Sequence, residues 1–373
     1  MKSHYLHRVP IYMDVHIIPG LKARDVAEAH RKDMLIQDEH ECKCMTYWID
    51  EERENVFCLI EAPGKEAVEE MHQRAHGLIP HRIIEVSSDL VQSFLGRIYD
   101  PENASVTADG LKVFSDTSFR VILAVSITDP ILLKSRIGAN ETSDFLRTQN
   151  EVIRKNFATY SGTEAQQDGP WVIASFRSAA KAVSCARAIL AELPVDNREA
   201  TGLRIAIHAG EPVTEAQELF GSTLRIARIM CSLALQQHIA ISSAVKELVS
   251  RDYFQEQGLY ELSPQDEQFL EQLFSVLESQ WKEPGFSIPD FCAAMAMSKS
   301  QLYRRTIEIT GESPNDLLKD YRLMRAKELM RKNRIPVSQA TFDAGFTSPS
   351  YFTKCFKKKF GLLPLAYLEL LDR

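Results

Sequence analysis

The sequence lacks a long apolar run. Although 45% of its 373 residues are hydrophobic, no stretch approaches the ~20 consecutive apolar residues that a membrane-spanning helix needs. The first residues, Met1 to Tyr5, lack the apolar core of a signal peptide. The seven cysteines are an odd number scattered along the chain, which does not indicate a disulfide framework. These absences argue against a membrane protein and a disulfide-bonded secreted domain, so we expect a cytoplasmic protein with no membrane partner.

The sequence also lacks a long low-complexity tract and a repeat that spans domains. A chain of 373 residues is too long for one ordinary core. We expect three domains, over residues 1–104, 105–258 and 259–373, in a multidomain α+β protein.

Charge is distributed unevenly along the chain. The formal net charge is −7, but residues 285–373 hold 15 Lys and Arg against 9 Asp and Glu. This segment therefore carries +6, and the rest of the chain carries −13. A basic module on an acidic body is expected when one part contacts phosphates and the other does not.

Histidine is concentrated in the first segment. Eight of the ten histidines precede Arg82, and Cys42, Cys44 and Cys58 lie among them. Imidazole and thiolate are ligands that transition metals prefer.

The first segment predicts a strand, a helix, two strands, a helix and a strand. The apolar periodicity places these elements at 11–17, 23–36, 44–49, 56–60, 65–75 and 82–86. This βαββαβ order is typical of a ferredoxin-like fold. Residues 88–107 contain Asp100-Pro101-Glu102-Asn103 and are interpreted as a linker.

Five segments of this part carry a family resemblance. Residues 9–86 resemble a ferredoxin-like family of uncharacterised domains that includes nickel-binding proteins, through YMDVH (12–16), AHRKD (29–33), YWIDE (47–51), VFCLIEAP (56–63) and HQRAHG (72–77). The resemblance implies a metal or small-ligand sensor domain.

Spacing within these segments suggests metal ligands. Asp14 and His16 share one face of a strand, and His72 and His76, four apart, share one face of a helix. Nickel is favoured, with zinc and copper as alternatives. The competing interpretation is that these histidines are hydrogen-bonded surface or core residues and that Cys58 is a small buried hydrophobic residue. The candidate ligands are His16, His30, Cys58 and His76, followed by Asp14 and His72.

The middle segment alternates strands and helices and predicts an α/β sandwich. Strands are expected at 119–125, 171–176, 203–208 and 239–242, with helices at 141–157 and 178–193 and a loop entering a helix over 219–232. FRVIL (119–123), IASF (173–176), LRIAIHAGE (203–211), FGST (220–223) and IAIS (239–242) resemble the class III nucleotidyl cyclase fold.

Catalysis in that family requires two metal-binding carboxylates. Here the first position falls on Ser126 and the second on Pro170, while Asp168 would match only with an insertion. The family's transition-state asparagine falls on Arg225. We therefore expect a cyclase-like domain without catalysis, acting in dimerisation or ligand sensing.

The last segment predicts two successive helix-turn-helix units. Helices begin at Ile288 and Ser298, and the layout returns at Pro336 and Ser348, with a long helix over 315–331 between the units. The run AGFTSPSYFTKCFKKKFG (344–361) and Tyr367 strongly resemble the signature of the AraC family of transcription regulators. LYRR (302–305) and GESP (311–314) resemble the first unit of that family, so the resemblance covers residues 265–373.

Recognition helices enter the major groove with polar or cationic side chains on their first turns and cations near their ends. The phenylalanines of the second unit are expected in the core. The predicted DNA-binding residues are Ser298, Lys299, Ser300, Gln301, Arg304, Arg305, Ser348, Ser350, Tyr351, Lys354, Lys357 and Lys358.

Together these patterns predict a homodimeric transcription regulator that binds double-stranded DNA and is not an enzyme. Its effector is expected to be a transition metal, nickel favoured, or a small ligand bound by the N-terminal part. The alternatives are a nucleotidyl cyclase-type enzyme and a regulator whose effector is a nucleotide or another organic molecule.

Overall fold

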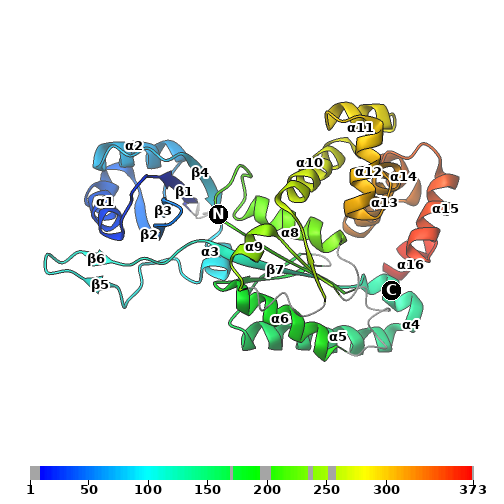
Figure 1. Cartoon of the computed structure of the whole chain (residues 1–373), viewed down its shortest axis with the longest axis horizontal. Coiled ribbons are helices and arrows are strands. Elements are labelled where there is room, and N and C mark those ends of the chain that lie inside the picture. Colours follow the sequence, from blue (N-terminus) through cyan, green and yellow to red (C-terminus); the bar gives the residue numbers. More distant parts are fainter. Residues whose placement is uncertain (1–8, 169–170, 194–202, 234–237, 251–257, 372–373) are drawn as a thin grey trace, which may run out of the picture.

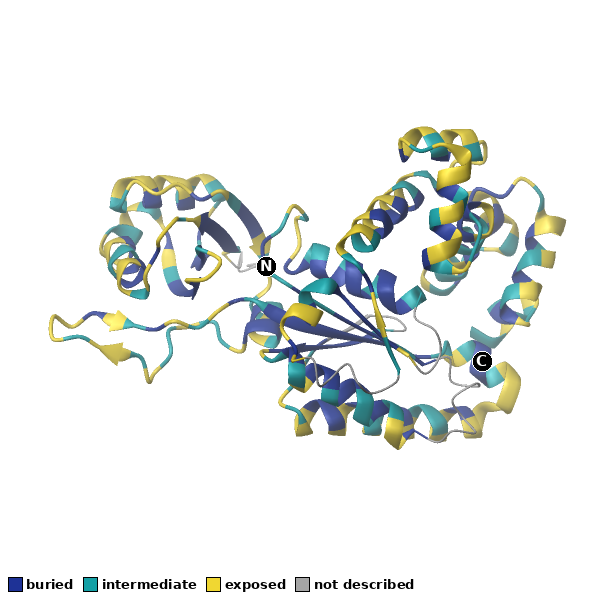
Figure 2. Cartoon of the chain, in the orientation of Figure 1, coloured by how far each residue is buried: buried dark blue, intermediate teal, exposed yellow. Residues whose placement is uncertain are grey.

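The computed structural model describes residues 9–168, 171–193, 203–233, 238–250 and 258–371, and its elements form two α/β domains and a helical module (Figure 1). Both sheets are largely buried, whereas the outer helices carry exposed stripes (Figure 2). Within the described residues, no helix is long and apolar enough to cross a membrane.

The N-terminal domain is a four-stranded antiparallel sheet with two helices on one face. Its strand order is β2-β3-β1-β4. The elements are β1 (Ile11–Ile17), α1 (Ala23–Ile36), η1 (Gln37–His40), β2 (Lys43–Asp50), β3 (Asn55–Glu61), α2 (Lys65–Ala75) and β4 (Arg82–Val86). The predicted βαββαβ order is confirmed, because the alternation of apolar residues distinguishes strands from helices here.

The residues after β4, where the sequence predicts a linker, form a helix that packs against the middle domain. Helix α3 (Ser88–Leu95) ends at Gly96, whose φ of 84° suits glycine. Its Val91, Phe94 and Leu95 are buried in a hydrophobic cluster that contains residues of both sheets, and the Phe94 ring contacts Phe220 of the middle domain. The linker interpretation is therefore wrong for residues 88–95. The polar run at 100–103 suggested a linker for the whole segment, although a short amphipathic helix precedes it.

A buried arginine fixes α3 to the middle domain. Arg120 donates to the Phe94 carbonyl at 3.0 Å and to the Leu95 carbonyl at 3.1 Å. A cation at the carboxyl end of a helix satisfies its free carbonyls and complements its dipole. The hairpin of β5 (Ser105–Val106) and β6 (Lys112–Val113), which sequence reasoning did not predict, precedes this arginine.

The middle domain is a six-stranded mixed sheet covered by helices on both faces. Its strand order is β12-β11-β10-β7-β9-β8. The elements are β7 (Arg120–Ser126), α4 (Pro130–Ile137), α5 (Ala139–Thr159), β8 (Thr163–Asp168), β9 (Trp171–Phe176), α6 (Ala179–Glu192), β10 (Arg204–Gly210), α8 (Gly221–Leu233), β11 (Ile239–Ile241), α9 (Ser243–Glu247) and β12 (Leu259–Glu261). The segment β8-β9-β7-β10 repeats the strand order of the N-terminal sheet.

Two strands of this sheet were not predicted. β8 lies at one edge and is polar in sequence, and β12 at the other edge has only three residues. Edge strands need no continuous apolar run, so periodicity misses them. β12 follows the expected domain boundary at residue 258 and still pairs with β11.

The C-terminal module is entirely helical in its described part. It contains α10 (Pro264–Gln280), α11 (Ile288–Ala294), α12 (Lys299–Thr310), α13 (Pro314–Asn333), α14 (Val337–Asp343), α15 (Pro349–Phe360) and α16 (Pro364–Leu371). The predicted pairs of short helices and the long connecting helix are present. Ser263 caps α10 by accepting from the Asp266 amide at 3.2 Å.

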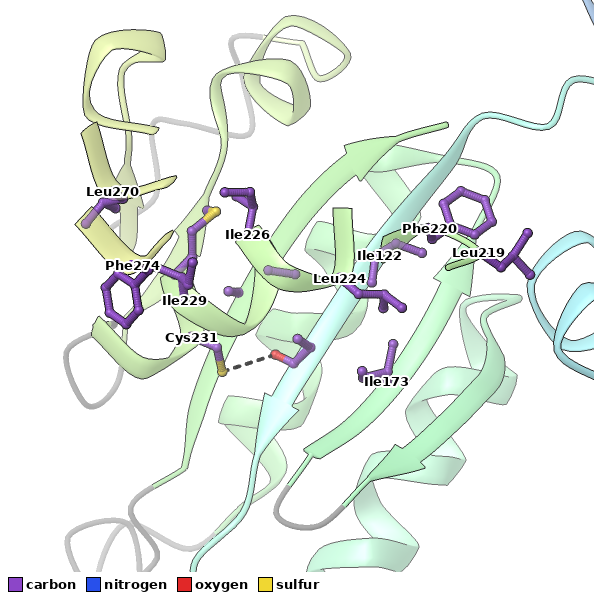
Figure 3. Close-up of a cluster of buried hydrophobic side chains, with 14 of the residues drawn as sticks. Ile122, Ile173, Leu219, Phe220, Leu224, Ile226, Ile229, Cys231, Leu270 and Phe274 are labelled. Carbon is purple, nitrogen blue, oxygen red and sulfur yellow. Dashed lines mark hydrogen bonds between the residues drawn. The ribbon is translucent and has the colours of Figure 1, made fainter. Parts of the chain in front are cut away.

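Helix α10 joins this module to the middle domain. Leu270 and Phe274 of α10 lie beside α8, whose opposite side packs on the sheet residues Ile122 and Ile173 (Figure 3). A second contact lies at Asp129, just before α4, which accepts hydrogen bonds from the Tyr367 hydroxyl at 3.2 Å and pairs with Lys327 at 2.7 Å. The helical module therefore contacts the middle domain at two separate places.

Candidate metal site and candidate DNA interface

Four potential metal ligands meet between the N-terminal sheet and α2. Asp14 and His16 point from β1 to the helix-covered face, because side chains two apart on a strand share a face. Cys58 of β3 lies directly opposite Asp14 in the antiparallel register, and His72 of α2 lies above them. All four side chains are buried, and one potential ligand atom from each lies within 4.8 Å of the others.

Hydrogen bonds hold this cluster together. The His72 Nε2 lies 2.9 Å from Asp14 Oδ2, and the Cys58 amide donates to Asp14 Oδ1 at 3.1 Å. His16 Nε2 lies 3.5 Å from the same Oδ1. Each group is therefore oriented by a neighbour, as ligands in metal sites usually are.

A second group shares His72. Asp33 of α1 lies 3.1 Å from His72 Nδ1, and His76 Nε2 lies 3.2 Å from an oxygen of Asp33. Asp33, His72 and His76 again bring one potential ligand atom each within 4.8 Å. The two groups form a continuous polar cluster in an otherwise apolar interior.

Charges inside this cluster depend on one another. Burial alone would lower the pKa of His72, but its hydrogen bonds to Asp14 and Asp33 and their charges raise it to about 10. Burial likewise opposes ionisation of Asp33, yet hydrogen bonds from His72 and His76 lower its pKa to about 2. Burial raises the pKa of the Cys58 thiol, and the nearby Asp14 raises it further. In the absence of a cation, the protonated His72 offsets carboxylate charge, and the neutral Cys58 thiol adds no further negative charge.

A cavity of about 250 Å³ opens beside the cluster. Its apolar wall includes Leu21 and Val26, and its polar wall includes His16, His30, Asp33, Cys58, His72 and His76. The cluster is therefore accessible to an ion or a small ligand, and its imidazole, thiolate and carboxylate donors fit nickel, zinc or copper better than magnesium or calcium.

The first recognition-type helix, α12, begins with a complete capping box. The Ser298 hydroxyl accepts from the Gln301 amide at 3.3 Å, and the Gln301 side chain accepts from the Ser298 amide at 3.0 Å. Lys299, Ser300 and Arg304 are exposed on the following turns. Leu302 and Thr306 face the interior.

The second recognition-type helix, α15, also begins at a serine cap and has one buried and one exposed face. Ser348 caps it by accepting from the Tyr351 amide at 3.3 Å. The expected core residues Phe346, Phe352, Phe356 and Phe360 are buried, as predicted. The predicted side chains that are exposed on this helix are Ser350, Tyr351, Lys354, Lys357 and Lys358.

Comparison with known proteins identifies the families that the N-terminal domain and the C-terminal module resemble. The family described as "Helix-turn-helix domain" matches residues 291–369. The family described as "Nickel responsive protein SCO4226-like" matches residues 12–86.

The C-terminal module is an AraC-type helix-turn-helix domain. Relatives of this region include a histidine kinase P4 from Formosa agariphila, 35% identical over 28% of this chain and 8% of its own length. The transcriptional activator RhaR from Escherichia coli O139:H28 is 25% identical over 36% of this chain and 49% of its own length. The chain thus spans less than half the length of these curated relatives.

The N-terminal part is an SCO4226-like domain. The crystal structure of SCO4226 from Streptomyces coelicolor A3(2) is 31% identical and covers 20% of this chain and 94% of that protein, with a TM-score of 0.19. The predicted resemblances at both ends of the chain are therefore confirmed at the level of the domain.

The SCO4226-like domain places five of the six expected ligands in the cluster. Asp14, His16, Cys58 and His72 form one group, and His76 belongs to the other. His30 lies in neither group; its Nε2 is 3.6 Å from Asp100 Oδ2, and its ring packs edge-on against Tyr47. Sequence reasoning missed Asp33, although a carboxylate one turn after His30 on the buried face of α1 was a usable signal.

In the helix-turn-helix domain, one expected DNA contact is directed elsewhere. Arg305 pairs with Asp266 of α10 at 2.8 Å and with Glu308 at 3.4 Å. Its guanidinium also lies over the Phe269 ring. We therefore withdraw Arg305 from the DNA interface, because tertiary pairing with α10 holds its side chain.

Two of the positions aligned with cyclase catalysis lie at the same end of the middle sheet, because Ser126 and Asp168 both pair with Trp171 of β9. Ser126 ends β7 and Asp168 ends β8, while Pro170 lies outside the described residues. Arg225 of α8 is tied to α10 through Glu278 at 3.0 Å and Glu271 at 3.9 Å. This arginine connects two helices.

Proposed function

We propose that this protein is a DNA-binding transcription regulator whose affinity for DNA responds to a transition metal, nickel favoured, bound in the SCO4226-like domain. The observation that carries the proposal is the buried group of Asp14, His16, Cys58 and His72 in the same chain as an AraC-type module. The description of the matching N-terminal family as nickel responsive supports the choice of metal.

The residues of the cluster would have different roles in binding the metal. His16, Cys58 and His72 would supply nitrogen and sulfur ligands, and Asp14 a carboxylate oxygen. Asp33 would orient His72 from its other ring nitrogen, at 3.1 Å. The bound cation would supply positive charge that replaces the protons on His72 and Cys58.

The exposed side chains of α12 and α15 would contact DNA. Lys299, Gln301 and Arg304 would reach base edges or phosphates from α12. On α15, Ser350, Tyr351 and Lys354 would do so, and Lys357 and Lys358 would contact phosphates. The cap residues Ser298 and Ser348 would place their helix amino ends against the backbone.

A chain of contacts supports communication between the two sites. Asn55 begins β3, the strand that carries Cys58, and donates to Glu211 of the middle domain at 2.6 Å. Helix α10 packs on the middle domain and pairs with α12 through Asp266 and Arg305. The middle domain, residues 105–258, would act as the connecting and dimerising body.

The experiment measures DNA affinity of the full chain with and without Ni(II). Binding fragments are selected from a random-sequence library, and fluorescence anisotropy is recorded across metal concentrations. We expect about a tenfold change in affinity or more, within the usual range of allosteric coupling. Cys58→Ser and His72→Gln should abolish the change, while His81→Gln, which alters an exposed histidine outside the cluster, should retain it.

Two results would contradict the proposal. DNA affinity that is constant across Ni(II), Zn(II) and Cu(I) titrations would eliminate metal as the effector. Production of a cyclic nucleotide from ATP or GTP with Mn(II) would favour the enzyme instead, although Ser126 provides no carboxylate at the first cyclase metal position.

A further inference from the structure

A second cavity, of about 410 Å³, lies where the middle domain meets α10. It shares no lining residue with the metal cluster. Its walls come from the end of β10, the loop before α8, α8 itself and the first turns of α10. The polar lining residues are His208, Glu211, Thr214, Ser222, Thr223, Glu267, Gln268 and Glu271.

Three glutamates line the cavity, and one of them, Glu271, pairs with Arg225 of α8 at 3.9 Å. Glu211 accepts a hydrogen bond from the neutral amide of Asn55, and Glu267 accepts one from the backbone amide of Ser243. In the part of the chain that the structure describes, neither carboxylate has a Lys or Arg within ion-pair distance. Burial raises the pKa of both carboxyls, although the charge of Arg53 acts in the opposite direction on Glu211.

A half-buried imidazole with one unpaired nitrogen also lines the cavity. The Nδ1 atom of His208 is buried at the cavity wall and has no hydrogen-bond partner among the described residues. Burial lowers the pKa of His208 to about 4, so the ring is neutral near pH 7. Buried polar atoms are nearly always paired, and a neutral ring can accept a hydrogen bond from a cationic donor.

The size and lining of the cavity favour an organic cation over a metal ion. A volume of about 410 Å³ is far larger than one water molecule occupies. Among the described residues, only the two N-terminal groups bring three metal-binding side chains close together. Ala209, Ile226 and Pro264 also line the cavity, so its walls suit an aliphatic stem as well as charged ends.

We propose that this cavity binds a small aliphatic polyamine or diamine, with its ammonium groups at Glu211 and Glu267 and a donor directed at His208. The ligand would touch the loop that Asn55 holds and the helix that leads to the DNA-binding module. The protein would then have two effector sites, one for a metal and one for an organic cation.

The test uses the full chain with putrescine and spermidine as probes, by calorimetric titration and thermal unfolding. Both amines should bind and raise the unfolding temperature by a few degrees, since a ligand of the native state stabilises it. The isosteric but uncharged 1,4-butanediol should have no effect, and sodium chloride at equal ionic strength controls for screening.

Variants locate the binding site. Glu211→Gln with Glu267→Gln keeps the hydrogen-bond acceptors and removes the charges, and amine affinity should fall at least tenfold. Glu278→Gln alters a carboxylate on the same helix outside the cavity and should bind like the wild type. Should the double variant fail to fold, as judged by circular dichroism, His208→Phe provides the second test and should weaken spermidine binding.

Either of two outcomes would overturn the proposal: no binding by either amine to the wild type, or unchanged amine affinity in a folded cavity variant. Stabilisation by ATP without any effect of the amines would do the same. Nickel binding is measured separately on each variant, so failure here leaves the metal proposal standing.

Discussion

Asn55 and Glu211 connect the two α/β domains through a hydrogen bond of 2.6 Å. Asn55 opens β3 three residues before Cys58, and Glu211 follows β10 at the wall of the second cavity. One side-chain contact therefore lies between the strand that carries a candidate metal ligand and the cavity beside α10. A rearrangement of β3 would therefore be transmitted to the helical module through the Asn55–Glu211 contact and α10.

Asn55→Ala should uncouple the domains without emptying the metal site. It removes a hydrogen bond to a carboxylate, so we expect about 1.5–3 kcal/mol of lost stability. Nickel affinity should stay within twofold of the wild type, while the nickel-dependent change in DNA affinity should shrink. Anisotropy titrations measure both, with Asn103→Ala, an exposed asparagine, as the matched control. A full nickel response in Asn55→Ala would show that coupling takes another route.

Substitutions of the neighbouring residues Arg304 and Arg305 should have different effects. Arg304 is exposed on α12, whereas Arg305 is paired with Asp266 of α10 at 2.8 Å. Arg304→Ala should cost about 1–3 kcal/mol of specific DNA binding. Arg305→Ala should instead lower stability by up to about 1 kcal/mol, as expected for a partly exposed ion pair. The two variants are compared by anisotropy on selected DNA and by thermal unfolding; the reverse pattern would return Arg305 to the DNA interface.

Much of the fold could be predicted because its signals are local. Alternation in β1 and helical spacing in α2 define both elements with their observed ends. Helix α3 was missed because eight residues offer little periodicity and a conspicuous polar run follows them. The edge strand β8 was missed because it buries little apolar surface.

In the candidate sites, too, residues could be predicted from local spacing, but pairings between distant segments could not. Asp14, His16, Cys58 and His72 could be proposed from residue type and spacing, and the fold brings them together. Asp33 joins the cluster and His30 does not, although both line the same cavity; which of the two reaches His72 depends on how α1 packs. The pairing of Arg305 with Asp266 joins residues 39 positions apart, and no short-range pattern reports it.

Metal removal should destabilise the N-terminal domain. Nickel at about a hundred times its dissociation constant should add about 2.7 kcal/mol to the native state. Dialysis against a chelator should lower the unfolding temperature, and Cys58→Ser should eliminate the difference together with any thiolate-to-nickel absorption band. An identical unfolding temperature with and without metal in the wild type would show that nickel does not bind this cluster.

His208 should make stability depend on mildly acidic pH. Burial lowers its pKa to about 4, against about 6.5 in an unfolded chain. Between these values the unfolded state binds more protons, so the stability conferred by the neutral ring is complete above pH 6.5 and is lost as pH falls toward 4. The loss amounts to about 3 kcal/mol at most. His208→Gln should remove this slope, as measured by the difference in unfolding free energy from the wild type; parallel pH curves would refute the assignment.

The lysines at the end of α15 allow a direct test of phosphate contact. Lys357 and Lys358 are exposed, whereas Lys359 is paired with Asp320 of α13. Each phosphate contact contributes about −0.9 to the slope of log affinity against log salt. Lys357→Gln with Lys358→Gln should therefore make the slope shallower by about 2 and weaken binding to all DNA sequences alike. Lys359→Gln should leave the slope unchanged and lower only stability, because its charge is already held within the protein. A double variant with the wild-type slope would show that these lysines form only a solvated face, and the basic charge of the module would then have to act through other residues.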